Sequence, residues 1–312
     1  MLWVKQGLIY QPGKQYDWNQ SHAAVPVVDQ LNDKVWRIYY ATRDRQNHSR
    51  LSYTEVEAGR PEKILYEHTA PVLDLGKLGT FDDCGVMPSW IVNVGRQKYL
   101  YYIGLTVRQS VPYHNSIGLA VSHDDGHSWE RYSEGPIFGL TPREPYFTGT
   151  SCVLIEDGVW KNWYLSCVKW EVVNGKLEPF YHLKYAESLD GIHWQREGHV
   201  AIDFKSKDEA GLVKASVLRT TEGYRMWYAY RDAQEYRTAK QHSYRIGYAE
   251  SVNGKTWTRR DEQAGIDVSD EGWDAEMMAY PHVIAHAGNL FMFYNGNGFG
   301  QSGFGYAVAP IQ

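Results

Sequence analysis

The sequence has few of the features that mark membrane, secreted or nucleic-acid-binding proteins. Its 312 residues contain no run of about 18 apolar residues, the length that a membrane-spanning helix needs. Lysine and arginine are not gathered into long runs and the net charge is −5, which argues against duplex nucleic acid as the main partner. The first residues lack the basic segment and apolar core of a secretory signal, so we expect a cytoplasmic protein without a membrane span.

The common cofactor and nucleophile motifs are missing as well. The three cysteines, Cys84, Cys152 and Cys167, are an odd number without the spacing of metal ligands, which favours reduced thiols. No glycine-rich phosphate loop stands before a helical pattern, and no Gly-x-Ser-x-Gly elbow occurs. The sequence therefore predicts no cofactor and no metal site.

One short motif occurs three times. The copies are Ser122–Trp129, Ser188–Trp194 and Ser251–Trp257, and each follows a strand-like stretch. Within each copy, Asp or Asn beside Gly makes a tight turn, and the tryptophan three residues after the glycine begins the next strand. Extended helical periodicity is nearly absent, whereas 24 tyrosines and 12 tryptophans favour strands. The motif therefore predicts a repeated hairpin in an all-β chain.

The repeat extends over the whole sequence. Similar strands without the turn, at Arg50–Thr54 and Gly303–Ala307, bring the number of units to five, and two strand-like stretches precede each of these strands. Five such units predict an all-β fold, a five-bladed β-propeller, in a single domain of residues 1–312. We expect the five blades at about 20–75, 80–140, 146–200, 210–265, and 274–312 together with 1–12.

The two ends of the chain are expected to pair. The fifth unit stops shortly after its third strand, and the stretch Leu2–Tyr10 before unit one could supply the missing fourth strand. Such pairing would close the ring of blades and remove an exposed strand edge.

The candidate site lies at one end of the propeller axis. The first strand of each blade lines that axis, so residues before the first strands and after the second strands meet in one funnel. Before the first strands stand His22, Asp82, Asp83, Glu144, Glu209, Lys214, Asp274 and Glu276. After the second strands stand Arg43, Asp44, Arg108, Lys169, Arg231, Asp232 and Asn295, and possible walls are Tyr102, His114, Trp170, Tyr280 and His282. Acids, bases and aromatic rings at one mouth are what a sugar site needs, so we expect a carbohydrate substrate.

With its five units, its Ser-x-Asp-Gly-x-x-Trp turns and its acids before the first strands, the chain resembles the five-bladed propeller glycoside hydrolases. These are the family 43 arabinanases and xylosidases with their invertase and mannoside phosphorylase relatives. In that superfamily the catalytic acids come from the starts of different blades. The resemblance implies Asp83, or its neighbour Asp82, as one acid and Glu276 as the other, because Asp83 and Glu276 both stand five residues before a proline. Glu209 with Asp82 is the alternative pair.

The chain departs from the family patterns in unit one. The Asn-Asp-Pro of invertases and the Glu-Asp-Pro-Arg of mannoside phosphorylases are both absent, and no clear Asp-Pro of the arabinanase type occurs there. The resemblance therefore implies a divergent member, and it does not carry over a particular sugar.

Several readings of the funnel residues stay open. Two carboxylates suit the cleavage of a glycosidic bond, because one supplies a proton and the other a negative group or an activated water. A guanidinium prefers a carboxylate or phosphate, so Arg43 and Arg231 could bind an acidic sugar or inorganic phosphate, or else only fix loops through Asp44 and Asp232. The expected substrate-binding set is His22, Arg43, Asp44, His114, Trp170, Arg231, Asp232, Asp274 and His282.

The predicted function is that of a glycoside hydrolase. The alternatives are a phosphorylase or glycosyl-transferring enzyme that uses a cationic phosphate site, and a non-catalytic carbohydrate-binding propeller in polysaccharide biosynthesis.

Overall fold

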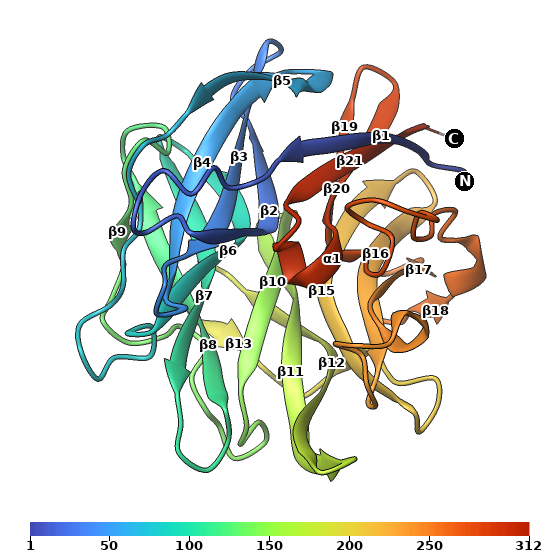
Figure 1. Cartoon of the computed structure of the whole chain (residues 1–312). Coiled ribbons are helices and arrows are strands. Elements are labelled where there is room, and N and C mark those ends of the chain that lie inside the picture. Colours follow the sequence, from blue (N-terminus) through green and yellow to red (C-terminus); the bar gives the residue numbers. More distant parts are fainter. Residues whose placement is uncertain (312) are drawn as a thin grey trace.

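The computed structural model describes residues 1–311, and nearly all of its regular elements are β-strands. The strands form antiparallel units that follow one another along the chain (Figure 1). Unit one contains β2 (Ser21–Gln30), β3 (Val35–Arg43), β4 (Ser49–Glu57) and β5 (Arg60–Glu67). Unit two contains β6 (Gly85–Val94), β7 (Gln97–Val107), β8 (Tyr113–Ser122) and β9 (Glu130–Arg131).

The next two units repeat this order. Unit three contains β10 (Thr148–Glu156), β11 (Val159–Val173), β12 (Lys176–Ser188), β13 (Trp194–Gln195) and β14 (Val200–Ile202). Unit four contains β15 (Glu209–Thr220), β16 (Gly223–Asp232), β17 (Arg245–Ser251) and β18 (Thr258–Arg259). The helical segments of the described chain are short: η1 (Lys240–His242), η2 (Asp261–Gln263) and α1 (Asn297–Gly300).

The last unit is built from both ends of the chain. It contains β19 (Ala279–His286), β20 (Asn289–Asn295), β21 (Phe304–Pro310) and the N-terminal strand β1 (Val4–Tyr10). Strand β1 pairs antiparallel with β21, and the two termini lie near each other in Figure 1. The pairing of the two ends that the sequence predicts is therefore present.

The first strands of the units lie side by side. β2 contacts β6, β6 contacts β10, β10 contacts β15, β15 contacts β19, and β19 contacts β2. Each of these strands carries a register shift near its beginning, and Val25, Lys214 and Tyr280 adopt positive φ there. Such bulges redirect side chains, here at the level where the loops between units converge.

The repeated turns connect neighbouring units. In the second copy, the Ser188 hydroxyl oxygen accepts the Gly191 N–H at 2.9 Å, and the Trp194 indole donates to the Gly191 carbonyl at 3.0 Å. The same carbonyl accepts the Tyr101 hydroxyl of the preceding unit at 2.7 Å. The first and third turns receive equivalent bonds from Tyr39 and Trp163. The turns thus have a structural role in holding the units together.

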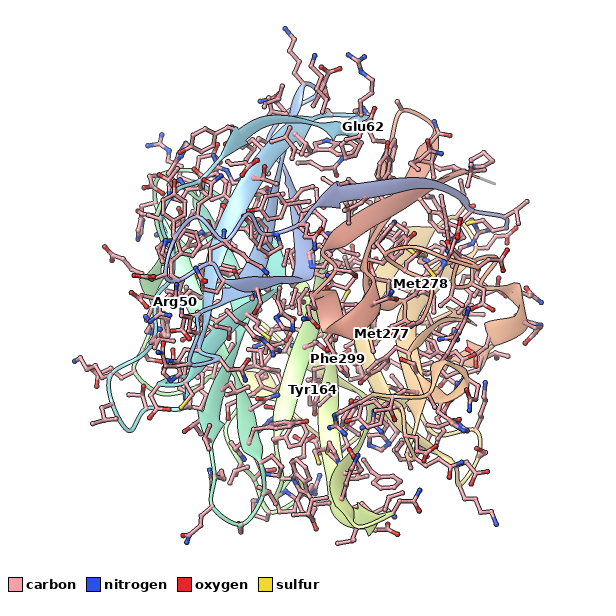
Figure 2. All side chains as sticks on the ribbon, viewed as in Figure 1. Arg50, Glu62, Tyr164, Met277, Met278 and Phe299 are labelled. Carbon is pink, nitrogen blue, oxygen red and sulfur yellow. The ribbon has the colours of Figure 1, made fainter. Side chains whose placement is uncertain are left out.

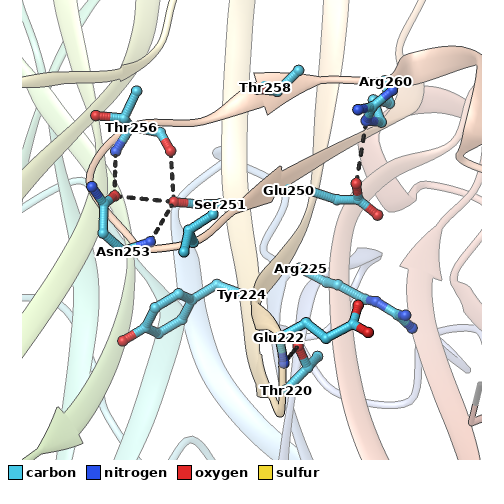
Figure 3. Close-up of a pocket in the computed structure, with 11 residues that line it drawn as sticks. Thr220, Glu222, Tyr224, Arg225, Glu250, Ser251, Asn253, Thr256, Thr258 and Arg260 are labelled. Atoms are coloured by element: carbon cyan, nitrogen blue, oxygen red, sulfur yellow. Dashed lines mark hydrogen bonds and ion pairs between the residues drawn. The ribbon is translucent and has the colours of Figure 1, made fainter.

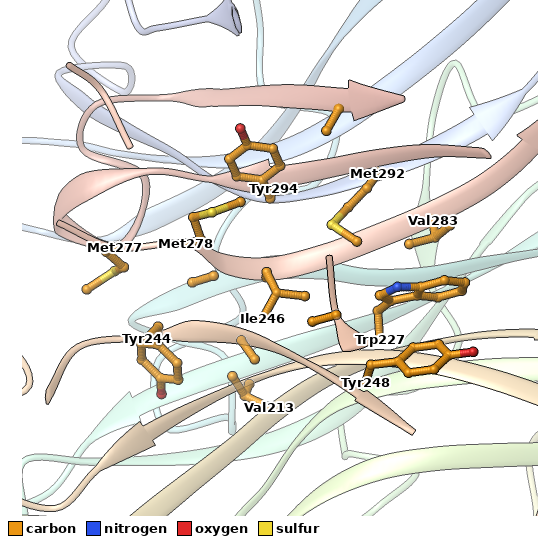
Figure 4. Packing of buried hydrophobic residues seen from close by; sticks show 14 of the residues in the cluster. Val213, Trp227, Tyr244, Ile246, Tyr248, Met277, Met278, Val283, Met292 and Tyr294 are labelled. Carbon is orange, nitrogen blue, oxygen red and sulfur yellow. The ribbon is translucent and has the colours of Figure 1, made fainter. Parts of the chain in front are cut away.

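The apolar core lies between the sheets of adjacent units. Figure 4 shows the part between unit four and the last unit, where Trp227, Ile246, Met278 and Met292 pack against one another. The Trp3 ring, next to β1, packs edge-on against the Trp227 ring with a centroid distance of 5.8 Å. No helix within residues 1–311 is long and apolar enough to cross a membrane.

Candidate functional site

A cavity of about 540 Å³ opens where the ends of the second strands meet the loops that lead into the first strands. It is called the axial cavity below. Its walls are mainly aromatic and basic, with Arg43, His48 and Arg237 among them. Five tyrosines also line it: Tyr113, Tyr181, Tyr236, Tyr244 and Tyr280. No Asp or Glu belongs to the described residues that line this cavity.

Phe299 of α1 forms part of the cavity wall and is labelled near the middle of Figure 2. Its ring stands edge-on to the rings of Tyr236 and Tyr244, with centroid distances of 6.3 and 6.1 Å. Its φ of 60° is strained for an aromatic residue, and the contacts with the two tyrosines hold it in that conformation.

A separate hollow of about 410 Å³ lies on the rim of unit four (Figure 3). It is lined by residues of the third Ser-Asn-Gly-Trp turn and by the ion pair of Glu250 with Arg260 at 3.2 Å. None of the loops that lead into the first strands contributes to it. The rim hollow is therefore a product of the structural turn, and the axial cavity is the better candidate site.

Two of the predicted catalytic acids are held in buried ion pairs. Asp82 accepts hydrogen bonds from Arg131 Nε at 2.8 Å and from the Tyr102 hydroxyl at 3.0 Å. Both carboxylate oxygens of Glu209 accept from Arg259, at 2.7 and 2.9 Å. Asp82 is 1% and Glu209 2% exposed, and neither lines the cavity. In each pair the cation comes from the outer strand of the same unit.

The same arrangement recurs in two more units. The Glu144 carboxylate accepts the Tyr164 hydroxyl at 2.9 Å and lies 3.2 Å from Arg196. Asp274, a predicted substrate ligand, accepts Lys5 Nζ at 2.7 Å and the Tyr294 hydroxyl at 3.0 Å. Because their lone pairs are used within the unit, these acids brace the units rather than face the cavity.

Among the described residues, no cationic side chain lies within ion-pair distance of Asp83 or Glu276. The half-buried Asp83 accepts the Gly79 N–H at 3.0 Å, and its neighbour Cys84 lines the cavity. Burial would raise the pKa of the Asp83 carboxyl, but hydrogen bonds from Gly79, Thr106 and Cys84 outweigh it and lower that pKa. The Asp83 carboxylate is thus kept in its ionised form.

Glu276 is exposed and lines a second hollow of about 580 Å³. Tyr236 and Arg237 line both this hollow and the axial cavity, so the two spaces adjoin. The backbone N–H of Glu276 donates to Asn297 Oδ1 at 2.8 Å, which ties this residue to α1. Glu276 therefore lines the adjoining hollow, whereas Asp83 lines neither space and is next to the axial cavity through its neighbour Cys84.

The two predicted arginines have different surroundings. Arg231 is 1% exposed, and its guanidinium donates to the carbonyls of Asp232 and Pro179 at 2.8 Å each. It also lies 3.8 Å from the centroid of the Tyr236 ring, behind the cavity wall. Arg43 lines the cavity itself, and the hydrogen bond that it makes goes to Asn47, at 3.0 Å. Arg43, not Arg231, is thus available to a ligand.

Asp44 and Asp232 fix loops. Asp44 pairs with Arg50 at 2.7 Å and with His48 at 3.3 Å. Asp232 accepts from His242 at 2.8 Å. Neither aspartate pairs with the arginine that precedes it in the sequence.

The predicted histidines differ in position. Burial and then the charge of Arg43 lower the pKa of His22 to about 4, so His22 is a neutral neighbour of Arg43 near pH 7. Burial, followed by the charge of Arg108, lowers the pKa of His114 to about 4 as well. His282 is buried against the Trp90 ring at a centroid distance of 4.7 Å, so it belongs to the core.

Trp170 stands behind the cavity rather than in it. Its ring packs on that of Tyr113 at 5.3 Å and on that of Phe147 at 5.7 Å. Four residues that line the cavity carry no sequence signal that marks them in advance: Tyr181, Tyr236, Tyr244 and Arg237. They lie on third strands or in long loops, where no local pattern separates them from the many other tyrosines.

No protein-family model matches the chain. Two curated proteins of Mycobacterium tuberculosis match it along nearly their whole length: Uncharacterized protein MT1551 of strain CDC 1551 / Oshkosh and Uncharacterized protein Rv1502 of strain ATCC 25618 / H37Rv. Each is 38% identical over 308 residues, which cover 99% of this chain and 99% of the relative.

Solved structures share the fold at low identity. A glycoside hydrolase superposes with a TM-score of 0.72 at 18% identity, covering 98% of this chain and 92% of that one. A thermostable family-43 glycoside hydrolase gives 0.66 at 16% identity, over 92% and 88% of the chains. The β-1,2-mannobiose phosphorylase of Listeria innocua gives 0.68 at 13% identity, over 99% and 96%. The predicted resemblance to the propeller glycoside hydrolases, as a divergent member, is confirmed at the level of the fold.

Proposed function

The chain belongs to the same family as the two Mycobacterium tuberculosis proteins, and we propose that it is an enzyme that acts on glycosides. The proposal is supported by the glycoside hydrolase fold together with a cavity whose tyrosine rings and polar side chains suit a sugar. A carbohydrate is the proposed substrate.

We propose that the five strand units are the five blades of one propeller domain. The contacts that run from β2 through β6, β10, β15 and β19 back to β2 support this arrangement. The pairing of β1 with β21 supports closure of the ring by the N-terminal strand. The axial cavity then stands at the mouth of the central funnel.

The proposed catalytic pair is Asp83 and Glu276. One observation carries this choice: both stand before a first strand and have no cationic partner within residues 1–311, whereas Asp82, Glu209 and the equivalent acids are held in ion pairs. The ionised Asp83 suits the role of base or nucleophile. Glu276, at the adjoining hollow, would be the proton donor to the leaving oxygen.

The test is turnover of a panel of 4-nitrophenyl glycosides and short oligosaccharides, each with and without inorganic phosphate. We expect Asp83→Asn and Glu276→Gln each to lower kcat by about 10²- to 10⁴-fold with little change in thermal stability. Glu222→Gln, an exposed carboxylate on the rim of unit four, is the matched control and should keep full activity. Wild-type rates in Asp83→Asn would show that Asp83 and Glu276 are not the catalytic pair.

A phosphorylase is the second candidate, because two cations, Arg43 and Arg237, line the cavity. Turnover that requires inorganic phosphate would select it over the hydrolase. Sugar binding without turnover, unchanged in Asp83→Asn, would instead indicate a binding propeller.

A further inference from the structure

One cation of the axial cavity, Arg43, has no carboxylate of the described chain to balance it, unlike the other basic residues there. Arg237 forms an ion pair with Glu178 at 2.5 Å, and His48 faces Asp44. Arg43 has no carboxylate within ion-pair distance in the described chain, although it is half-buried. A partly desolvated guanidinium without a counter-ion favours an anion from outside.

A hydrogen-bonded chain of side chains reaches the same cavity from behind. Arg231 Nε–H donates to the Tyr181 hydroxyl oxygen at 3.3 Å, and the hydroxyls of Tyr181 and Tyr244 are hydrogen-bonded to each other. The guanidinium can only donate, so it takes no proton from either hydroxyl. The two hydroxyls carry two protons, and one of these forms the hydrogen bond between Tyr181 and Tyr244. One O–H therefore remains for a partner at the cavity surface, which both tyrosines line.

The surroundings of the pair keep that O–H protonated and polarise it. Burial raises the pKa of the Tyr244 phenol well above its usual value, so the proton stays on the hydroxyl. The cation of Arg231 polarises the chain, and such chains strengthen the terminal hydrogen bond. Arg231 is a positioning residue here, because it does not reach the cavity.

Arg43 and the Tyr181–Tyr244 pair line the same cavity. Burial raises the pKa of Tyr280, and the phenol of Tyr181 and the charge of Arg43 both act on it. The ring centroids of Tyr280 and Tyr244 lie 6.1 Å apart. The four side chains that line the cavity here are Arg43, Tyr181, Tyr244 and Tyr280.

From these contacts we infer that the cavity binds an anionic group carried by the sugar, a carboxylate or a phosphate ester, between the Arg43 guanidinium and the remaining hydroxyl proton of the Tyr181–Tyr244 pair. This inference rests on the proposed function, since it names the substrate class of the same cavity. A neutral sugar would leave Arg43 without a counter-ion and lose the charge-assisted bonds, which gives a preference for the acidic sugar.

The experiment is isothermal titration of the full-length protein with matched probes at about 10 mM or below. The probes are glucose, galactose and mannose, their uronic acids, their 6-phosphates, and inorganic phosphate. We expect at least one acidic sugar to bind about 10- to 100-fold more tightly than its neutral counterpart, and its affinity to fall as the salt concentration rises. The uronic acids and the 6-phosphates distinguish the two sources of charge.

Variants locate the site. Arg43→Gln and Tyr244→Phe should each weaken the acidic sugar by about tenfold or more and leave the neutral sugar unchanged. Tyr132→Phe is the control, because Tyr132 is an exposed tyrosine that does not line the cavity. Arg43→Lys, which keeps the charge, should retain part of the affinity and shows whether a loss in Arg43→Gln reflects misfolding.

Three results would overturn the inference: no binding by any acidic sugar, equal affinity for acidic and neutral sugars, or full acidic-sugar affinity in Arg43→Gln. Binding of inorganic phosphate as tight as that of the best acidic sugar would also overturn it, because the anion would then be a co-substrate. Asp83→Asn separates this inference from the proposed function, because that variant should lose turnover while acidic-sugar binding persists.

Discussion

Lys214 is a single residue whose charge works against the fold. It is 0% exposed, its ammonium has no hydrogen-bond partner among the described residues, and it lies 4.8 Å from the centroid of the Trp90 ring. Burial lowers its pKa from 10.5 to about 8, and the neighbouring Cys152 opposes this only in part. A buried ammonium without a counter-ion is costly, so the charged form of Lys214 destabilises the folded state.

We therefore expect Lys214→Met to stabilise the protein. Because the folded-state pKa lies below the unfolded one, the unfolded chain binds the proton first as pH falls from about 10.5 to 8, and below 8 the penalty is constant. The gain in unfolding free energy should be about 2–4 kcal/mol at pH 7 and vanish above about pH 10.5. Urea unfolding at a series of pH values measures it, with the exposed Lys207→Met as control. An unchanged or lower stability at pH 7 would contradict this reading.

At the same scale, the sequence could not separate bracing acids from free ones. Asp82 and Asp83 are adjacent and of the same type, yet Asp82 meets Arg131 and Tyr102 while Asp83 meets the Gly79 N–H. The difference depends on a cation 49 residues away in the sequence, which no local pattern reveals. Tyr181 and Tyr244 were missed for a similar reason, because their pairing spans 63 residues.

At the scale of the elements, a glycine on the third strand makes room for the bracing tyrosine. A Cβ at Gly118 of β8 would lie 2.3 Å from Cζ and 2.6 Å from the hydroxyl of Tyr102 on β7. This close approach lets the Tyr102 hydroxyl reach Asp82. Gly247 stands against Tyr228 in unit four in the same way, with an approach of 2.6 Å.

Gly118→Ala should therefore destabilise unit two. Tyr102 would have to move away from Asp82, which costs about 2–4 kcal/mol through overpacking and a lost buried hydrogen bond. Gly135→Ala is the control, because a Cβ there meets nothing within 4 Å. Thermal unfolding of the two variants gives the comparison, and equal melting temperatures would show that the strand pair adjusts without cost.

The strands and turns were predictable because the same residue pattern occurs in several units of the sequence. The Ser-Asp-Gly-Trp turns, the strand order within units and the pairing of β1 with β21 all follow from the sequence. Arg43 and Tyr280, which the sequence placed near the funnel, line the cavity, but Tyr181, Tyr236 and Tyr244 lie on third strands or in long loops, where the repeat gives no pattern for them.

At the scale of the whole molecule, the last unit depends on both ends of the chain. In unit two the brace joins Asp82, just before β6, to Arg131 of β9 within one continuous stretch of the chain, but Asp274 receives its cation from Lys5 of β1 at the other end of the chain. Asp274 is 1% exposed, so without Lys5 its carboxylate would keep the Tyr294 hydroxyl as its partner and lose its counter-charge. Loss of one partner from such a pair is destabilising.

We expect Lys5→Met to lower the unfolding free energy by about 1–3 kcal/mol, reduced from the value of a fully buried pair because the Lys5 side chain is 26% exposed. If β1 closes a ring, the loss should reach every unit, and hydrogen exchange should accelerate in β2 and β15 as well as in β21. Lys176→Met, an exposed lysine on β12, is the control and should change neither quantity. Faster exchange confined to β1 and β21 would mean that the N-terminal strand only covers an edge, and that the remaining strands form a stable fold without it.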